Sequence, residues 1–140
     1  MTPDSLIPVR EQLLVIHDPG DLATVVRGRY PQFEVAIAPS YMDGLAALAR
    51  QSPRGLLVGV DPTARKLSSA IAGLRKAAGP ESRIVLCCMP SGEPVARRVV
   101  AAGADDYLIY PPSGGELDAG LALSTPGWES RLTTPEPPIP

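Results

Sequence analysis

Residues 103–112 read GADDYLIYPP: a glycine, two acids, a short apolar run, a tyrosine and two prolines. Four other short runs rich in Val, Ile and Leu precede this one at fairly even intervals. Most are continuous rather than alternating, as expected for parallel strands that are covered on both faces. The five runs are residues 13–16 (LLVI), 34–38 (EVAIA), 55–60 (GLLVGV), 83–88 (RIVLCC) and 106–110 (DYLIY).

Segments with helical character separate these runs. Residues 63–78 place three large apolar side chains at the i, i+4, i+7 spacing of an amphipathic helix. Residues 93–102 have Pro94 just inside their start, where its missing N–H costs little, and Gly103 as a stop. Further helices are expected at residues 41–51 and, with glycines that blur their limits, at 21–29 and 114–124.

Five strand–helix pairs in succession predict an α/β fold. We expect a five-stranded parallel sheet, doubly wound as (βα)5 in the flavodoxin-like manner, with helices on both faces in a three-layer α/β/α sandwich. The length of 140 residues fits one domain, which we place at residues 1–124. Residues 125–140 are rich in proline and are expected to form an extended tail or a linker. Trp128, the large side chain of this tail, either docks on the domain, stays in solvent or serves a partner.

Composition excludes several classes of function. A net charge of −2 and an aromatic content of 4% argue against a nucleic-acid partner. No apolar run is as long as a membrane span, and the N-terminus lacks the pattern of a secretion signal. The adjacent Cys87 and Cys88 fit a reducing, cytoplasmic location, and are expected to be small core residues. One histidine and no Cys-x-x-Cys pair leave too few ligands for structural zinc.

Ligands of open parallel sheets bind beyond the carboxyl ends of the strands, so the residues after each run are the candidate site. No Gly-x-Gly-x-x-Gly, no Gly-Lys-Ser/Thr and no Gly-x-Ser-x-Gly occurs there. We therefore expect no nucleotide cofactor and no enzyme activity. The candidate side chains are those of His17, Asp18, Asp61, Cys88 and Tyr110.

GADDYLIYP, with acids after the first and third runs, resembles the receiver domain (CheY-like) of bacterial two-component response regulators. The resemblance covers roughly residues 11–124. It implies phosphorelay signal transduction, in which an aspartate after strand three accepts a phosphoryl group from a histidine kinase. Two acids after strand one help to hold Mg²⁺, a Ser or Thr after strand four and a Lys after strand five bind the phosphoryl oxygens, and an aromatic residue on strand five changes rotamer.

The positions of this resemblance carry altered residues. The first acid of the pair corresponds to His17 and the second to Asp18. The phosphoacceptor corresponds to Gly59 when residues are counted without gaps, and Asp61 lies two residues later. An imidazole suits zinc or copper better than Mg²⁺, which prefers oxygen ligands.

The remaining positions fall on strands four and five. The Ser or Thr corresponds to Cys88 and the lysine to Tyr110, whose hydroxyl adds no positive charge. The switch aromatic corresponds to Tyr107, which matches the family. A phosphoryl site needs a carboxylate nucleophile, a divalent cation and positive charge. All three are affected here: the nucleophile is displaced or missing, one metal ligand is changed, and the lysine is lost.

The sequence therefore leaves three hypotheses. The first is a degenerate receiver, or pseudo-receiver, that acts as a protein-interaction module. The second is a working phosphorelay receiver with Asp61 as acceptor and Mg²⁺ held by Asp18 and Asp61; only this hypothesis requires a cofactor. The third is a small-ligand binder. Each candidate also has a structural interpretation: His17 and Asp18 cap the next loop, Asp61 caps a helix, and Tyr110 packs on the two prolines.

The partner of a pseudo-receiver would be a signalling protein (a histidine kinase or an output domain) or a second copy of the chain. The resemblance implies the surface of helix four, strand five and helix five, about residues 92–124. Its mixed charges can form complementary pairs across a two-fold axis. The candidate interface residues are Arg97, Arg98, Asp105 and Asp106.

Overall fold

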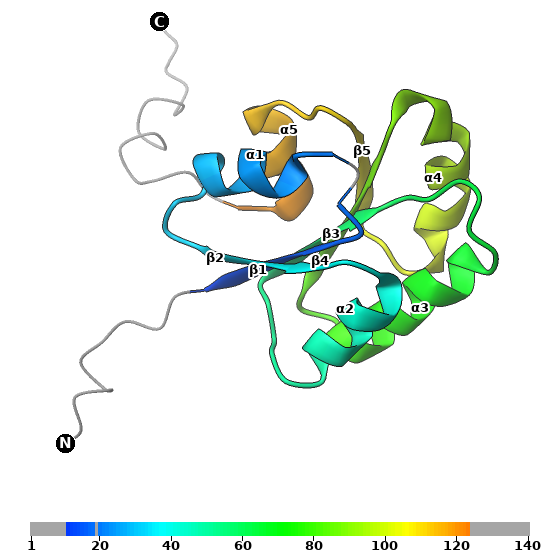
Figure 1. Ribbon diagram of the computed structural model, residues 1–140, viewed down its shortest axis with the longest axis horizontal. Coiled ribbons are helices and arrows are strands. Elements are labelled where there is room, and N and C mark those ends of the chain that lie inside the picture. Colours follow the sequence, from blue (N-terminus) through cyan, green and yellow to red (C-terminus); the bar gives the residue numbers. More distant parts are fainter. Residues whose placement is uncertain (1–10, 19, 124–140) are drawn as a thin grey trace, which may run out of the picture.

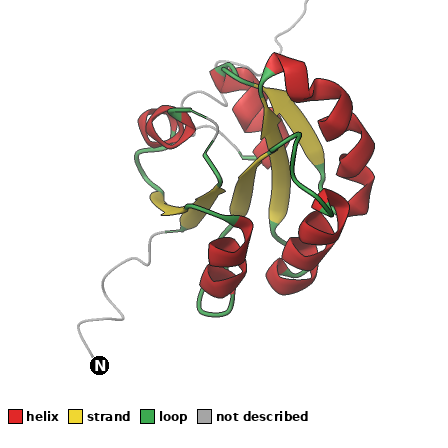
Figure 2. Cartoon of the chain, turned by 45° about the vertical axis from the view of Figure 1, so that its right-hand side comes forward, coloured by secondary structure: helices red, strands yellow, loops and turns green. Residues whose placement is uncertain are grey.

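The computed structural model describes residues 11–18 and 20–123. The predicted tail or linker at residues 125–140, which includes Trp128, lies outside these described residues. The chain forms a parallel sheet with the strand order β2-β1-β3-β4-β5 (Figures 1 and 2). The strands are β1 (Gln12–Ile16), β2 (Glu34–Ala38), β3 (Gly55–Gly59), β4 (Arg83–Cys88) and β5 (Asp106–Ile109).

Helices cover both faces of the sheet, so the predicted three-layer sandwich is confirmed. Helices α1 and α5 pack on one face, and α2, α3 and α4 pack on the other (Figure 1). The helices are α1 (Leu22–Arg29), α2 (Tyr41–Leu48), α3 (Leu67–Ala78), α4 (Glu93–Val99) and α5 (Gly114–Leu121), with 3-10 turns η2 (Pro90–Gly92) and η3 (Val100–Ala102) on either side of α4.

Burial follows the position of each strand in the sheet. Every residue of β3 is buried, and in β4 only the first residue is not. The outer strands β2 and β5 keep exposed positions, because one side of each has no neighbouring strand. The continuous apolar runs of the sequence therefore mark the central strands, as expected for strands covered on both faces.

Local signals fix several helix limits. Ser113 and Glu116 form a capping box at the start of α5: the Ser113 hydroxyl accepts from the Glu116 N–H, and the Glu116 carboxylate accepts from the Ser113 N–H. Pro94 lies in the first turn of α4, and η3 ends at Ala102 with Gly103 as its C-cap, in agreement with the predicted stop. Helix α3 begins at Leu67, four residues later than the predicted residue 63, because the loop after β3 takes up those residues.

Helices α1 and α5 are joined by Asp118. Its carboxylate accepts a hydrogen bond from the Tyr30 hydroxyl at 2.6 Å and forms an ion pair with Arg29. Burial alone would raise the pKa of Asp118, but the hydrogen bonds from Arg29 and Tyr30 outweigh it and hold this pKa below its ordinary range. The ionised carboxylate is therefore the form that the fold stabilises.

Replacing Asp118 by Asn tests this contribution. The amide keeps an acceptor oxygen but carries no charge, so we expect a loss of about 1 kcal/mol in the free energy of unfolding at pH 7, reduced by partial exposure of Arg29. A carboxylate whose pKa is lower in the folded state adds stability at pH values above its pKa in the unfolded chain, about 3.9. This stability is lost as the pH falls through the pKa of the folded state. Urea unfolding of both proteins at pH 7 and pH 3 should show a gap in the free energy of unfolding that narrows in acid. A gap of equal size at both values would contradict this role.

Candidate functional site

The parallel pairing of the strands brings the candidate residues to one edge of the sheet. Ile16 of β1 pairs with Val58 of β3, Gly59 pairs with Cys87, and Cys88 of β4 pairs with Ile109. The segments that follow these strands therefore start side by side. We call this region the carboxyl edge; it contains His17, Asp18, Tyr41, Gly59, Asp61, Cys88 and Tyr110.

Asp18 caps helix α1 from four residues before its first residue, Leu22. Its Oδ1 accepts from the N–H groups of Gly20 and Leu22, both at 3.0 Å, and its Oδ2 accepts from the Ala23 N–H at 3.1 Å. The first N–H groups of a helix have no partner within the helix, and a carboxylate satisfies them well. Both oxygens of Asp18 are thus bonded to the backbone, which agrees with the capping interpretation of the sequence.

His17 turns the chain sharply at the end of β1. Its φ of 54° is in the left-handed region, which a residue other than glycine seldom adopts. The His17 N–H donates to the Ala38 carbonyl at 2.8 Å, and the imidazole ring lies 5.4 Å from the ring of Tyr41. The imidazole is also close enough to Asp61 for its charge to contribute to the pKa of that carboxylate.

Asp61 lies two residues beyond β3, where the loop to α3 begins. Its Oδ1 accepts from the Thr63 N–H at 3.0 Å and from the Thr63 hydroxyl at 2.7 Å. These two hydrogen bonds, with a smaller effect of His17, lower the pKa of Asp61. The carboxylate is ionised and only partly buried, but it is turned into its own loop by Thr63, in the manner of an Asx turn.

Tyr41 is a residue of this edge that the sequence analysis missed. Its hydroxyl donates to the Gly59 carbonyl at 2.7 Å and accepts from the Asp61 N–H at 3.1 Å. Tyr41 thereby fixes the backbone where β3 ends. Gly59 itself is buried and supplies no carboxylate. Nothing in the sequence indicates that a tyrosine in the first turn of α2 forms hydrogen bonds with the backbone at the end of β3.

Tyr110 links the end of β5 to the loop after β1. Its N–H donates to the Cys88 carbonyl at 2.7 Å, and its hydroxyl accepts from the Asp21 N–H at 3.1 Å. The ring lies so close to Gly20 that a Cβ there would be 3.2 Å from it. The ring also packs against the core between the sheet and α1 and α5. Tyr110 therefore spans the region between β5 and the start of α1, and its packing on the prolines that follow it stays a prediction.

Cys87 and Cys88 are both free thiols, and both side chains are fully buried. Burial raises the pKa of Cys87 to about 12, and it raises the pKa of Cys88 as well. Neither thiol is ionised at neutral pH, so neither supplies a thiolate nucleophile. They fill opposite faces of β4, which agrees with the expected role in the core.

Tyr107, the residue at the switch-aromatic position, is held by helix α4. Its hydroxyl donates to Glu93 Oε2 at 2.6 Å, and the same carboxylate accepts from the Arg97 guanidinium. These contacts from Arg97 and then Tyr107 lower the pKa of Glu93. Of the four candidate interface residues, Arg97, Arg98 and Asp106 are exposed, and Arg97 also forms an ion pair within its own helix.

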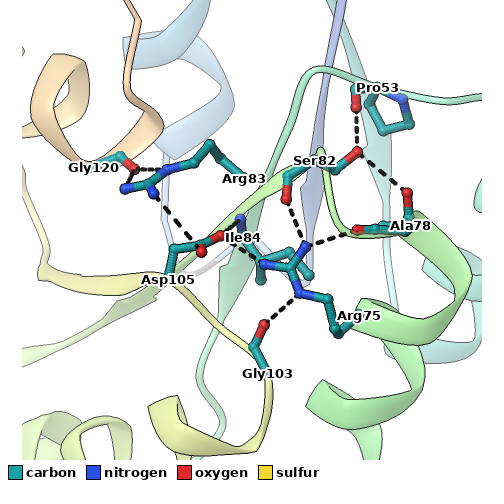
Figure 3. Close-up of polar contacts among 10 residues, drawn as sticks. Pro53, Arg75, Ala78, Ser82, Arg83, Ile84, Gly103, Asp105 and Gly120 are labelled. Atoms are coloured by element: carbon teal, nitrogen blue, oxygen red, sulfur yellow. Dashed lines mark hydrogen bonds and ion pairs between the residues drawn. The ribbon is translucent and has the colours of Figure 1, made fainter.

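Asp105 lies at the opposite, amino end of the sheet and belongs to an internal network (Figure 3). Its Oδ2 pairs with the Arg75 guanidinium at 2.6 Å and accepts from the Ile84 N–H at 2.8 Å. Arg83 approaches its Oδ1 at 3.7 Å. The contacts of Asp105 are therefore within the domain, and its interface role stays a prediction.

The donor groups at the carboxyl edge do not fit Mg²⁺ well. Mg²⁺ needs several oxygen ligands in octahedral geometry, but His17 provides an imidazole and both oxygens of Asp18 accept backbone N–H groups. Within residues 11–18 and 20–123, no three His, Cys, Asp or Glu side chains come together as a metal-binding group. None of the helices in that part of the chain is long and apolar enough to span a membrane.

Solved structures of response regulators and receiver domains have the same fold as this chain. A response regulator from Thermotoga maritima matches with a TM-score of 0.65 at 18% identity, over 78% of this chain and 92% of that chain. The receiver domain of a sensor histidine kinase from Pseudomonas aeruginosa, with a magnesium ion coordinated in its active-site cleft, matches with a TM-score of 0.62 at 18% identity, over 81% and 99%. A structure described as an adenylate cyclase from Rhodopirellula baltica matches with a TM-score of 0.64 at 18% identity, over 81% and 86%.

No family model matches this chain, and no curated protein matches its sequence. The structural likeness nevertheless establishes the fold, because it covers most of each chain. The predicted CheY-like, flavodoxin-like architecture is confirmed.

Proposed function

We propose that this domain is a receiver-like protein-interaction module whose state is not set by phosphorylation. The observation that carries the proposal is the position of Tyr110. In the family that the sequence resembles, this position needs a cation for the phosphoryl oxygens, whereas here a neutral hydroxyl accepts from the Asp21 N–H. An aromatic ring that joins β5 to the loop after β1 supports a fixed arrangement instead of a site for an incoming anion.

The other groups at the carboxyl edge support the same proposal. Asp18 is engaged with three backbone N–H groups, and Gly59 has no side chain to phosphorylate. Phosphoryl transfer to a carboxylate needs positioned positive charge as well as the nucleophile itself. A site without the lysine and with a poor donor set for Mg²⁺ lacks most of that charge. The module is therefore not an enzyme in this proposal and uses no cofactor.

The surface that we propose for the partner lies on α4 and β5, and we include Met89, which lies between β4 and η2. Ile109 is 42% exposed and Met89 is 44% exposed, and Arg98 and Asp106 add charges of both signs. Exposed apolar side chains among mixed charges are typical of interfaces between proteins. The partner would be a signalling protein of a two-component system or a second copy of this chain. The two buried, free thiols fit a cytoplasmic setting.

A second function is favoured by one observation. The Asp61 carboxylate is ionised and partly exposed at the end of β3, next to the acceptor position of receivers. In this alternative, the domain accepts a phosphoryl group on Asp61, and the loop opens by releasing Thr63. Mg²⁺ would be required, because no lysine compensates for the charge of the phosphoryl group.

Intact-mass measurement after incubation with acetyl phosphate and Mg²⁺ tests both functions. We expect no added phosphoryl group on the folded wild-type protein. Asp61→Ala and Asp106→Ala serve as matched controls, since each removes one carboxylate that is not in the core. A single phosphoryl increment that is lost only in Asp61→Ala and requires Mg²⁺ would overturn the pseudo-receiver proposal and establish the alternative.

A further inference from the structure

The outer strand β2 has a row of backbone groups that no strand of this chain pairs with. β2 pairs only with β1, so its other side is an open edge of the sheet (Figure 1). Hydrogen bonds to the chain of β1 begin at the Glu34 N–H and end at the Ala38 carbonyl, so these two residues face β1. Backbone groups of successive residues point to opposite sides of a strand, so those of Val35 and Ile37 point away from the sheet.

The donors and acceptors along this open edge form an uneven pattern. The Val35 carbonyl accepts from the Arg27 guanidinium at 3.2 Å, which agrees with its outward direction. The Val35 N–H and both backbone groups of Ile37 have no hydrogen-bond partner among the described residues. Pro39, which follows the strand, has no N–H and offers only its carbonyl. A partner strand has to match this pattern.

The pattern is complementary to itself. In an antiparallel pair, residues that lie directly opposite each other exchange both hydrogen bonds at every second position. With Ile37 opposite Ile37 of a second copy, each Ile37 N–H meets the other Ile37 carbonyl, and each Val35 N–H meets the Pro39 carbonyl of the other copy. The Val35 carbonyl then faces the proline, which has nothing to donate, and keeps its bond to Arg27. A register shifted by two residues would instead direct the Ile37 N–H at the Val35 carbonyl that Arg27 already occupies.

Side chains at the open edge favour the same arrangement. Ile37 is 48% exposed and leaves apolar surface beside the edge. The pairing would place the two Ile37 side chains directly opposite each other, where β-branched side chains pack well. On the other face of the strand, Ala36 would lie opposite Ala38 of the second copy, and neither side chain is large enough to obstruct the approach.

Helix α2 presents complementary charges beside this edge. Leu45 lies toward α3, since a Cβ on Gly73 would be 3.9 Å from its Cδ2. Asp43, Ala47 and Arg50 follow one another at i, i+4, i+7 spacing on the opposite side of the helix, which is the side of the open edge. Asp43 and Arg50, in the turn after α2, are exposed, and neither forms an ion pair within the described residues.

The antiparallel pairing would bring the two α2 helices together. Its two-fold axis is perpendicular to the sheet, so both helices lie on the same face and run in opposite directions. Each α2 packs over β1 and β2, so the helix axes would be separated by two strand spacings, or about 10 Å, a normal distance for packed helices. Asp43 of each copy would then face Arg50 of the other, with the small Ala47 between the helices.

We propose that two copies of this chain associate through their β2 edges, with Ile37 at the two-fold axis and ion pairs between Asp43 and Arg50 on α2. The two sheets become one continuous sheet, and the open edge is covered. β5 is the outer strand at the other end of the sheet, so the α4 and β5 surface of each copy stays accessible to a signalling protein. The proposal depends neither on that surface nor on phosphorylation of the carboxyl edge.

Sedimentation equilibrium of the full-length protein over a range of concentrations tests the association. We expect the wild-type protein to approach the mass of two chains as its concentration rises. Ile37→Lys should stay monomeric at concentrations where wild type is dimeric, because two ammonium groups would lie directly opposite each other. The Ile37 side chain is half-exposed, so the circular dichroism of this variant should match that of wild type.

Ile109→Lys is the matched control, because Ile109 is 42% exposed on the other outer strand, β5. It should associate as wild type does. A wild-type protein that is monomeric at every concentration would overturn the proposal. A dimer that persists in Ile37→Lys and is lost in Ile109→Lys would also overturn it, because the second copy would then bind at the α4 and β5 surface.

Charge reversal on α2 tests the helix contact. Asp43→Arg and Arg50→Asp should each weaken association by about tenfold, because each creates two pairs of like charges across the axis. The double variant restores opposite charges and should recover most of the wild-type affinity, which a mere loss of helix stability would not allow. A double variant as weak as the single variants would refute the assigned contact.

Nuclear Overhauser effects define the register. In a mixed sample of labelled and unlabelled chains, we expect a contact between the Hα of Ala36 in one copy and the Hα of Ala38 in the other. These residues form the non-hydrogen-bonded pair next to Ile37, where antiparallel strands approach most closely. Contacts between chains that involve only α4 and β5 would contradict the β2 interface.

Discussion

Replacing Arg75 by Ala is expected to lower the free energy of unfolding by about 3 kcal/mol, one of the largest effects of any polar substitution in this domain. Its guanidinium donates to the carbonyls of Gly103, Gly79 and Ser82 at 2.7 to 2.8 Å and pairs with Asp105 at 2.6 Å (Figure 3). Without it, three carbonyls lose this donor, and the partly buried Asp105 carboxylate keeps only the Ile84 N–H and the more distant Arg83.

The position of Arg75 explains why the loss should be global. The residue lies near the end of α3 and reaches the loop before β4 and the turn before β5. Asp105 continues the network to the Ile84 N–H at the start of β4. Gly103 permits the close approach, since a Cβ there would be 2.8 Å from the Arg75 Cβ. One side chain thus fixes the amino end of two neighbouring strands.

Two variants separate this role from charge alone. Arg75→Lys keeps the positive charge, but an ammonium group does not have the planar fork that reaches several acceptors, so we expect it to recover less than half of the lost stability. Arg98→Ala removes an exposed arginine on α4 and should change stability by no more than about 0.5 kcal/mol. Urea unfolding followed by circular dichroism gives all three values. An Arg75→Ala protein as stable as Arg98→Ala would refute the structural role of the network.

The sequence was sufficient to predict the fold because its signals are local and repeated. The runs that became β3 and β4 are continuous and apolar, which only a covered parallel strand explains well. Errors occurred at helix limits, where apolar periodicity is weak. The predicted helix at residues 41–51 ends at Leu48, and the predicted helix at 114–124 ends at Leu121, where Ala122 turns into the left-handed conformation.

The candidate site was predictable in its location but not in its contacts. Parallel topology alone places Asp18, Asp61 and Tyr110 at one edge, so their proximity followed from the order of the runs. Whether a carboxylate there faces solvent or the backbone depends on loop conformation, which one sequence does not specify. Asp105 shows the same limit: its partner Arg75 is thirty positions away, and only the packed fold brings the two together.

Replacing Asp18 by Ala is the second large expected effect. The carboxylate accepts from the first two N–H groups of α1 and from the Gly20 N–H in the loop before it, and its removal leaves these donors without this partner. We expect a loss of about 2 kcal/mol in the free energy of unfolding, at the upper end for the loss of a helix cap. Asp18→Asn keeps one acceptor oxygen and should lose about half as much. Thermal unfolding by circular dichroism measures both.

The same measurement in the presence of Mg²⁺ distinguishes a cap from a metal ligand. A protein that binds Mg²⁺ only when folded is stabilised as the concentration of Mg²⁺ rises, and removing a ligand abolishes that gain. If Asp18 acts as a cap, wild type and Asp18→Ala should keep the same difference in melting temperature with or without Mg²⁺. A difference in melting temperature that grows with Mg²⁺ would show that Asp18 can leave its backbone partners to hold the ion. The loop after β1, which contacts both the Asp18 carboxylate and the Tyr110 hydroxyl, would then have to open. Because the Tyr110 hydroxyl is bonded to this loop through the Asp21 N–H, Tyr110→Phe should ease such opening and enlarge the Mg²⁺ response only in that second case.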